Sequence, residues 1–296
     1  MDEVIVVGSI NVDRAVEVPE ALQRGATLLG GAVHRGPGGK GANQAVALAR
    51  LGRSVGIVGA VGSDADGAWM LEVLEGEGVD VAGVHRSESP TGQAFVFVEP
   101  GGESTIVVAP GANGALTPSD MDAIADRLRG ARCVLAQQEV PSGVVARAAE
   151  LCGGVFVLNP APARPLPAEV LVAVDVLVPN RHELAGLAGQ PGTEDIATLE
   201  RMARSLRGPD TVIVTLGEEG ALVVPDGTAV HVAAVPVDAV DATAAGDTFC
   251  AALVDALLDG ADAVEATRWA VLAASVAVGR RGAMDSIPHR SDIRAR

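Results

Sequence analysis

The chain has 296 residues, and its 22 Lys and Arg side chains against 38 Asp and Glu side chains give a formal net charge of −16. This charge argues against binding to nucleic acid or to an anionic membrane surface. Hydrophobic residues make up 48% of the chain, which is enough for a full-sized core and excludes a disordered protein. Aromatic residues make up only 2%, so few side chains can stack on a nucleobase.

The first residues of the chain and its longest apolar stretch both favour a cytoplasmic protein. The acidic start at residues 1–3 lacks the basic segment of a signal peptide. The longest apolar stretch, 269–278, is far shorter than the roughly 20 residues that a membrane span needs. Three widely spaced cysteines with apolar neighbours, Cys133, Cys152 and Cys250, are predicted to be reduced thiols in the core.

Short apolar runs rich in β-branched residues alternate with helical patterns along the chain. The buried strands predicted from these runs are 3–7, 55–61, 133–136, 155–158, 174–178 and 211–215. The helices predicted from three-to-four spacing are 41–51, 67–74, 119–128, 142–151, 196–206, 245–258 and 263–278. Such alternation predicts one α/β domain over 1–296, with a mostly parallel central sheet and helices on both faces.

Two segments depart from this alternation and predict a small second sheet. Residues 14–18 with 27–34, and 93–98 with 104–109, have the pattern of antiparallel hairpin strands, the second pair turning at 100–102. A small sheet with exposed edges must cover something or pair with another chain. We expect a β lid over a cleft, built from about 14–34 and 92–109.

The glycine-rich segment 36–41 contains Lys40, the only lysine beside 21 arginines. Its Gly-x-Gly-x-x-Gly spacing matches a dinucleotide fingerprint, but the next strand carries no acidic residue to bind a ribose. A Walker A loop is excluded because Gly41 stands where Ser or Thr should bind Mg²⁺. Two interpretations remain, a plain helix-entry turn or a turn that brings Lys40 and Asn43 close to a small polar ligand.

A second segment of small residues, 241–249, precedes a long apolar helix and places Asp247 in its first turn. Small residues at a helix entry leave backbone N–H groups free, and the helix dipole adds positive potential, so a phosphate can bind there without a basic side chain. Asp247 either complements the dipole or acts as a general base beside a phosphoryl group. In the second role the neighbouring amides hold the developing charge.

Seven motifs together resemble the ribokinase branch of the PfkB sugar-kinase family, in the family's order and over essentially the whole chain. They are Gly8-Ser9-Ile10-Asn11-Val12-Asp13, 38–45, 111–113, 159–164, Asn180-x-x-Glu183, 215–217 and 244–247. The resemblance implies a ribokinase-like α/β fold and an ATP-dependent sugar phosphotransferase. The implied reaction moves the γ-phosphate of ATP to the 5-hydroxyl of D-ribose, giving ribose 5-phosphate and ADP.

The resemblance also implies roles for individual residues. Asp247 would be the base, and the backbone amides of Ala244, Ala245 and Gly246 would form the anion hole. The sugar would be held by Asn11, Asp13, Gly39, Lys40, Asn43, Glu139 and Asp247. ATP would be bound by Asn180, Thr215, Gly217 and Gly246, with Mg²⁺ near Glu183. The nucleotide would lie near 240–243 and the helix that begins around Ala263.

A monovalent cation, usually K⁺, activates members of this branch. The matching positions are Asp241, Thr243, Ala277, Arg280, Gly282 and Ser286. Oxygen ligands suit a large hard cation, which would fix the anion-hole loop. The family usually has Thr directly after this aspartate, whereas this chain has Ala242, and a lost hydroxyl hydrogen bond is worth roughly 1 kcal/mol.

Other functions compete with ribose phosphorylation. A related kinase for another sugar, such as deoxyribose or fructose, or for a nucleoside would share the catalytic motif, and Ala94 and Val96 of the lid would shape the pocket wall. The shortage of aromatic residues weakens the nucleoside alternative. If the chain were a non-catalytic sugar-binding protein, residues of the base or the anion hole should be replaced, yet Gly246 and Asp247 are both present. The resemblance further implies a homodimer formed through the lid, with no nucleic-acid or membrane partner.

Overall fold

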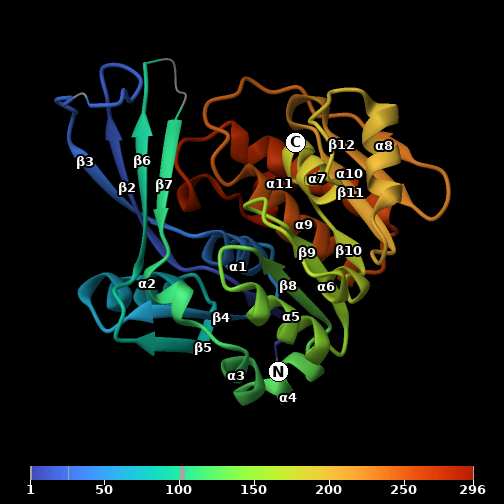
Figure 1. Ribbon diagram of the computed structural model, residues 1–296, viewed down its shortest axis with the longest axis horizontal. Coiled ribbons are helices and arrows are strands. Elements are labelled where there is room, and N and C mark those ends of the chain that lie inside the picture. Colours follow the sequence, from blue (N-terminus) through green and yellow to red (C-terminus); the bar gives the residue numbers. More distant parts are fainter. Residues whose placement is uncertain (1, 26, 101–103, 296) are drawn as a thin grey trace.

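A computed structural model describes residues 2–25, 27–100 and 104–295 of the chain. Its main sheet has the strand order β13-β12-β11-β10-β9-β8-β1-β4-β5 (Figure 1). These strands are β1 (Val4–Val7), β4 (Val55–Gly62), β5 (Asp80–Ser87), β8 (Cys133–Gln137), β9 (Val155–Asn159), β10 (Val176–Leu177), β11 (Thr211–Thr215), β12 (Ala221–Pro225) and β13 (Val230–Val232). The strands from β5 to β11 run parallel, and only β12 and β13 are antiparallel to their neighbours.

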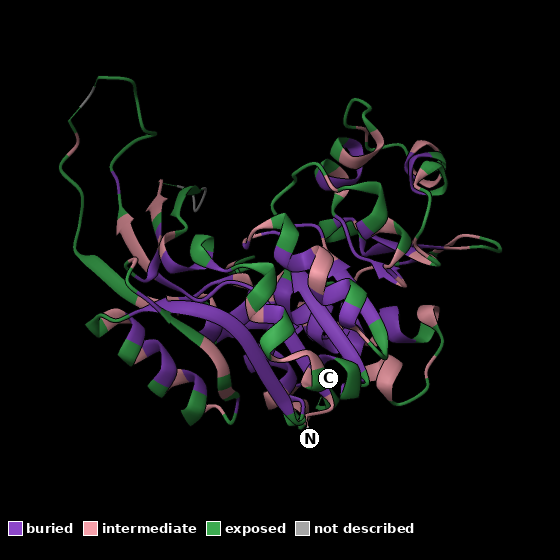
Figure 2. Cartoon of the chain, turned by 60° about the horizontal axis from the view of Figure 1, so that its bottom comes forward, coloured by how far each residue is buried: buried purple, intermediate pink, exposed green. Residues whose placement is uncertain are grey.

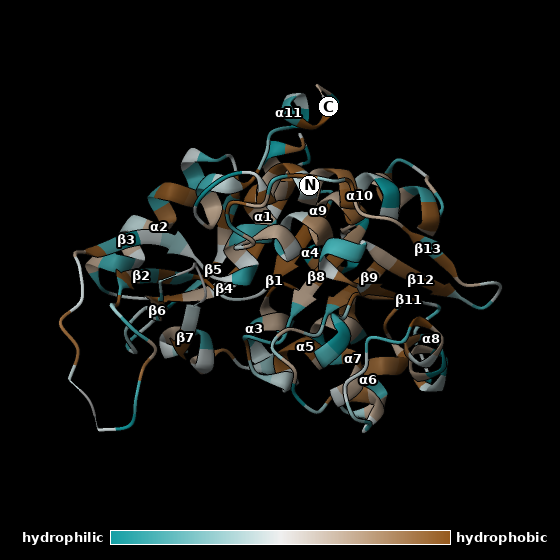
Figure 3. Cartoon of the chain, turned by 90° about the horizontal axis from the view of Figure 1, so that it is seen from above, coloured by the Kyte–Doolittle hydropathy of each residue, from teal (hydrophilic) through white to brown (hydrophobic). Residues whose placement is uncertain are grey.

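Helices cover both faces of the main sheet, as Figure 3 shows. One face is covered by α1 (Lys40–Arg50), α2 (Ala65–Gly76), α9 (Ala245–Leu258), α10 (Ala263–Val278) and α11 (Arg290–Arg294). The other face is covered by α3 (Pro118–Ala123), α4 (Ala125–Gly130), α5 (Ser142–Leu151), α6 (Ala168–Val172), α7 (Arg181–Ala188) and α8 (Ile196–Ser205). In β1, Val4 and Val6 face the first layer, whereas Ile5 and Val7 face the second, so apolar residues are needed on both sides.

The predicted α/β sandwich is therefore confirmed, with three local corrections. The predicted strand 174–178 is only Val176–Leu177. The predicted helix 119–128 is two helices, because Ile124 has a non-helical conformation between them. Strands β5, β12 and β13 were not predicted. The edge strand β5 is partly exposed and lacks a continuous apolar run, whereas β12 is buried and its short apolar run was missed.

The predicted small sheet exists, and we call it the lid sheet. It has the order β3-β2-β6-β7, formed by β2 (Asn11–Glu17), β3 (Val33–Gly38), β6 (Gly92–Val98) and β7 (Ser104–Ala109). The predicted strand 27–34 is wrong for most of its length, because β3 pairs with β2 only from Val33 onward. Residues 27–32 have no regular secondary structure and include Gly30 and Gly31. The expected turn at 101–102 lies outside the described residues.

The lid sheet projects from one end of the main sheet, and its strands are less buried than those of the core (Figure 2). It is tied to α2 through Asp66, which accepts hydrogen bonds from Arg14 and Arg35, each at 2.7 Å. The guanidinium of Arg35 also stacks 3.8 Å from the ring centre of Trp69. These contacts fix the orientation of the lid sheet relative to α2.

The cysteines are free thiols, as predicted: Cys133 and Cys250 are buried and Cys152 is partly buried.

Within the described ranges 2–25, 27–100 and 104–295, no helix is both long and apolar enough to cross a membrane.

Candidate active site

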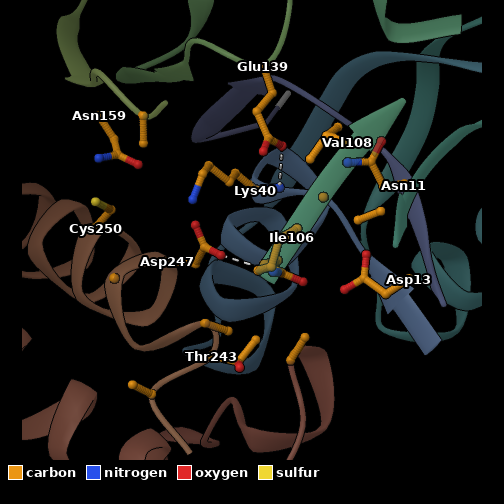
Figure 4. Close-up of a pocket in the computed structure, with 18 of the residues that line it drawn as sticks. Asn11, Asp13, Lys40, Ile106, Val108, Glu139, Asn159, Thr243, Asp247 and Cys250 are labelled. Atoms are coloured by element: carbon orange, nitrogen blue, oxygen red, sulfur yellow. Dashed lines mark hydrogen bonds between the residues drawn. The ribbon is translucent and has the colours of Figure 1, made fainter. Parts of the chain in front are cut away.

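A cavity of about 340 Å³ lies between the lid sheet and the carboxyl ends of the central strands. This edge of a parallel sheet is where ligands of α/β proteins bind. Figure 4 shows Lys40, Glu139 and Asp247 pointing into the cavity from three different parts of the chain. The lid contributes an apolar wall, formed by Ala94, Val96, Ile106 and Val108.

The structure brings all the predicted sugar-binding residues to this cavity. Its lining includes Asn11, Asp13, Gly39, Lys40, Asn43, Glu139 and Asp247. The predicted phosphate-side residues Asn180, Glu183, Thr215, Ala244 and Gly246 line it as well, as does Thr243, which was predicted to bind the monovalent cation. The remaining predicted residues, Ala245, Gly217, Asp241, Ala277, Arg280, Gly282 and Ser286, do not.

Asp247 lies in the first turn of α9 with its side chain almost fully buried. One carboxylate oxygen accepts a hydrogen bond from Asn43 Nδ2 at 2.9 Å, and the other accepts one from Gln44 Nε2 at 2.9 Å. Both donors come from the first turns of α1, because Gly39, with a φ of 92°, turns the chain into that helix. Two neutral amides therefore orient the carboxylate and leave it able to accept a proton.

The start of α9 supplies backbone donors to the same cavity. Ala244 precedes the helix in a left-handed conformation with a φ of 59°, and its side chain cannot cap the helix. A Cβ added to Gly246 would meet no atom within 4 Å, so this residue faces open space where it lines the cavity. The predicted anion hole needs one qualification: the Ala245 amide already donates to Ala242 O at 3.2 Å.

Asn11 and Glu139 are held in place by residues behind the cavity wall. Asn113 donates to Asn11 Oδ1 at 2.7 Å and is itself fixed by both backbone polar groups of Ile10. Glu139 Oε2 accepts hydrogen bonds from the Ser9 hydroxyl and from the Lys40 amide. Both side chains are therefore oriented before a ligand arrives, which suits recognition of hydroxyl groups.

Carboxylates outnumber cations in the cavity, and the pKa values respond to this. Burial, with repulsion from Glu139 and Asp247, raises the pKa of Asp13 to about 7. For Lys40, burial lowers the pKa, but Asp247, Glu139 and Glu183 outweigh that effect, so its pKa is raised. The positive charge of the Lys40 ammonium group thus offsets part of the negative charge of these carboxylates.

Asn180 and Glu183 form the start of α7 on the far side of the cavity. Asn180 caps the helix by accepting from the Glu183 amide at 2.9 Å, and Glu183 Oε2 accepts from the Asn180 amide at 2.8 Å. Burial raises the pKa of Glu183. Thr215, at the end of β11, bridges to Asn180 through the backbone. The cap uses one Glu183 oxygen, which leaves the other available to a hydrated Mg²⁺.

The predicted cation loop is assembled beside the entry to α9. Asp241 accepts from the amide and hydroxyl of Thr243 through one oxygen, and from the Gly282 amide at 2.9 Å through the other. Burial raises its pKa, but these hydrogen bonds outweigh burial, so the pKa of Asp241 is lowered. The Ser286 hydroxyl approaches Thr243 O at 3.4 Å. Asp241 therefore joins the loop before α9 to the loop after α10.

The oxygen atoms of this loop are of the kind that a hard cation binds. The Arg280 side chain forms an ion pair with Asp292 at 3.0 Å. Only the backbone carbonyl of Arg280 is therefore available as a ligand for a cation. Carbonyl, hydroxyl and carboxylate oxygens fit a hard ion of low charge. Among residues 2–25, 27–100 and 104–295, no three His, Cys, Asp or Glu side chains cluster as a metal site.

One prediction about the nucleotide is corrected. The amides of Val240 and Asp241 donate to Val278 O, so the carboxyl end of α10 lies beside the entry to α9. Ala263 begins α10 at its opposite end, about 22 Å away along the helix axis. We expected the nucleotide to lie near both 240–243 and Ala263, because the sequence does not show that α9 and α10 run antiparallel.

Several lining residues were not predicted. Asn159, Ala161 and Cys250 lie next to or within predicted motifs, and their position was the available signal. Gln44, which does not line the cavity, was not predicted either, although it contacts Asp247 directly. Burial, with the charges of Asp247 and Glu183, raises the pKa of the Cys250 thiol well above its ordinary value, so this thiol is not a nucleophile.

Comparison with known proteins agrees with this geometry. The sequence matches the pfkB family of carbohydrate kinases over residues 1–290. The chain belongs to this family. It is 38% identical over 292 residues to a ribokinase from Haemophilus influenzae, covering 97% of this chain and 95% of that protein. It is 35% identical over 293 residues to a deoxyribokinase from Salmonella typhi, covering 97% and 95%.

The fold agrees with solved structures of the family. The structure of Arabidopsis thaliana ribokinase complexed with ribose and ATP matches with a TM-score of 0.92 and 33% identity, covering 99% of this chain and 98% of that one. The family and the ribokinase-like fold expected from the sequence are therefore confirmed, and the chain is a carbohydrate kinase.

Proposed function

We propose that this kinase transfers the γ-phosphate of ATP to the 5-hydroxyl of D-ribose, giving ribose 5-phosphate and ADP. The observation that carries the proposal is the position of Asp247. Its carboxylate lies in the first turn of α9, inside a cavity whose other polar groups are arranged for a small polyhydroxylated ligand. A hydroxyl bound there meets a proton acceptor and the start of a helix at the same point.

The chemistry follows from these two features. Asp247 accepts the proton of the attacking hydroxyl while Asn43 and Gln44 hold the carboxylate in place. The free amides at the start of α9, Gly246 among them, stabilise the charge that grows on the transferred phosphoryl group. This part of the anion hole works without the Ala245 amide, which the preceding turn already uses.

Sugar recognition is assigned to the opposite wall. Asn11, Asp13 and Glu139 present acceptors and donors to hydroxyl groups, and Lys40 balances their charge. The apolar lid residues lie against the carbon face of the sugar and exclude water. Asn180, Thr215 and Gly217 are assigned to ATP, although Gly217 lies outside the cavity lining.

Two cations complete the proposal. Mg²⁺ bound to ATP would be held through water by Glu183, and it would neutralise charge on the phosphates. K⁺ would be held by Asp241, Thr243, Ala277, Arg280, Gly282 and Ser286, and it would fix the loop that precedes α9. The oxygen donors described above support both assignments.

Deoxyribose is the second candidate substrate, because a deoxyribokinase is 35% identical to this chain. The two sugars differ in the 2-hydroxyl alone, so discrimination depends on whether one polar group in the cavity is left without a partner when that hydroxyl is missing. Fructose and nucleosides share the same phosphoryl-transfer chemistry and belong in the same assay.

We also propose a homodimer formed through the lid sheet and a cytoplasmic location, where ATP is available. β3 and β7 are the edges of the lid sheet, and Val33 and Val107 on them are 64% and 54% exposed. Exposed apolar edge strands favour pairing with another chain. Sedimentation at micromolar concentration tests this, and a monomer would contradict it.

A coupled assay of ADP release over ribose, deoxyribose, fructose and nucleosides, with and without K⁺, tests the function. We expect the highest kcat/KM with ribose. Asp247→Asn should lower kcat by roughly 10² to 10⁴ while leaving sugar binding measurable by calorimetry. Sugar binding without ADP release in the native protein would favour the non-catalytic alternative.

A further inference from the structure

Gln44 is a buried amide that no predicted motif role uses. It lies in the third position after Gly41 of α1 with none of its surface exposed. Its Nε2 group donates to Asp247 Oδ1 at 2.9 Å and approaches Asn159 Oδ1 at 3.3 Å. Burying a polar side chain so fully is costly unless its hydrogen bonds are made, and here they converge on the proposed base.

The direction of these hydrogen bonds is set by charge. A carboxylate only accepts, so Asp247 requires Gln44 to turn its NH₂ group toward it. The Gln44 oxygen then faces the other way and accepts from Gln137 Nε2 at 2.5 Å. A chain of hydrogen bonds therefore runs from the Gln137 amide through the Gln44 amide to Asp247. As long as Asp247 is ionised, each amide must donate toward the carboxylate.

The far end of this chain is held by close packing. A Cβ on Gly8 would stand 1.9 Å from Gln137 Oε1, so only glycine at this position leaves room for the Gln137 amide. Asn159, the second acceptor of Gln44, is itself fixed by donating to Val178 O at 2.9 Å. The central strands β8 and β9 thus determine where Gln44 lies, and Gln44 determines where the carboxylate points.

We propose that Gln44 is a positioning residue for Asp247, held in register by Gln137. The inference rests on the proposed role of Asp247 as the base. Asn43 lines the cavity and is free to serve both carboxylate and sugar. Gln44 does not line the cavity, and its hydrogen bonds go to Asp247, Asn159 and Gln137. Loss of its hydrogen bond therefore affects the chemical step more than sugar binding.

The test is Gln44→Met, which keeps the length of the side chain but removes the donor. We expect kcat to fall about 10- to 100-fold, while KM for the sugar changes less than about 3-fold. The acidic side of the pH profile of kcat should move to higher pH, because the ionised form of the base loses a donor. Gln44→Glu, nearly isosteric, places a second carboxylate there and should shift the profile in the same direction and further.

A double-mutant cycle separates positioning from a general structural role. In the Asp247→Asn background, Gln44→Met should change kcat less than about 2-fold, because its effect passes through the carboxylate. Gln138→Met, a buried glutamine one position along from Gln137 that does not line the cavity, is the matched control and should leave kcat unchanged. Circular dichroism and Tm of each variant show whether it folds. If Gln44→Met does not fold, Gln44→Glu replaces it in the test.

The outcomes distinguish this inference from the proposed function. If Asp247→Asn lowers kcat as expected but Gln44→Met and Gln44→Glu keep the kcat and pH profile of the parent, the positioning role is wrong and the base assignment stands. Equal losses from Gln44→Met in both backgrounds also contradict it. If Asp247→Asn itself retains full kcat, the base assignment fails and the inference fails with it.

Discussion

The backbone amide of Lys40 donates to Glu139 Oε2 at 3.2 Å, so the residue fixes this carboxylate through its main chain while its ammonium group lies in the cavity (Figure 4). The two contributions of Lys40 can be separated by mutation, because the backbone bond survives any change of side chain. The single lysine of the sequence is thereby a direct probe of charge in the cavity.

Lys40→Ala should weaken sugar binding while leaving Glu139 in place. The three carboxylates that act on Lys40, those of Asp247, Glu139 and Glu183, lose their counter-charge, and we expect KM for the sugar to rise at least about 10-fold. KM for ATP should change less than about 2-fold, since we assign Lys40 to sugar binding. Lys40→Arg should not restore affinity, because a planar guanidinium does not match an ammonium site. An effect confined to ATP would show that the loop is wrongly placed.

Asp13 should make both sugar affinity and stability depend on pH near neutrality. Its pKa is raised from 3.8 to about 7. The folded chain therefore keeps a proton between these values that the unfolded chain releases, and Asp13 lowers the stability progressively as pH rises from about 4 to about 7. KM for the sugar should fall over the same upper range, because the ionised carboxylate accepts from hydroxyls.

Asp13→Asn tests both effects. The variant should have a higher Tm than the parent at pH 8, and the difference should disappear near pH 4. Its KM for the sugar should be raised and nearly constant from pH 6 to pH 8. A Tm difference that is the same at both pH values would show that Asp13 does not titrate in this range.

Gly41→Ala should destabilise the fold where α1 meets the end of β1. A Cβ there would lie 2.6 Å from Gly8 C and 2.7 Å from Ser9 N, and backbone atoms cannot move aside easily. We expect a loss of about 1 to 3 kcal/mol in the free energy of unfolding. Gly76→Ala, at the end of α2 with no atom near its added Cβ, should be neutral or slightly stabilising by the same urea titration.

Asp66→Ala should loosen the lid sheet. The change leaves Arg14 and Arg35 without their shared acceptor at the base of the lid. Hydrogen exchange in β2 and β6 should accelerate, and KM for the sugar should rise about 3- to 10-fold because lid closure becomes less well defined. Asp126→Ala, which removes a fully exposed ion pair with Arg129, should change neither quantity.

Asp241→Ala should reduce activation by K⁺. The change removes the carboxylate that joins Thr243 to Gly282, so the loop before α9 loses its link to the loop after α10. We expect the ratio of kcat with and without K⁺ to approach 1. Ala242→Thr, which restores the hydroxyl usual in the family, should lower the K⁺ concentration needed for half-activation. Unchanged K⁺ dependence in Asp241→Ala would contradict the proposed ligand set.

The sequence predicted the elements whose signal is local. Residues 142–151, 211–215, 245–258 and 263–278 have the predicted bounds, because a buried strand or helix shows its own apolar pattern. What it could not provide is how distant elements meet. The position of Ala263 relative to the nucleotide and the length of the strand predicted at 27–34 both depended on how elements pack against one another.

The site shows the same division. Motifs identified Asp247, Asn43 and Lys40, since each belongs to a short segment with a recognisable spacing. Gln44 lies inside one of those motifs, on α1, yet its partners Gln137 and Asn159 lie on strands β8 and β9. Its contact with Asp247 joins positions more than two hundred residues apart, which no periodicity in the sequence can indicate.

The pairing of β2 with β6 has a consequence for the order in which the protein folds. The two outer pairs of the lid sheet are antiparallel hairpins, but β2 and β6 run parallel, with Asn11 opposite Gly92. Everything from α1 to β5 lies between them in the chain. Closing so large a loop is slow unless the intervening segment is already compact. The lid sheet should therefore assemble only after β1, β4 and their helices have formed, so a nascent chain acquires its sugar cavity last.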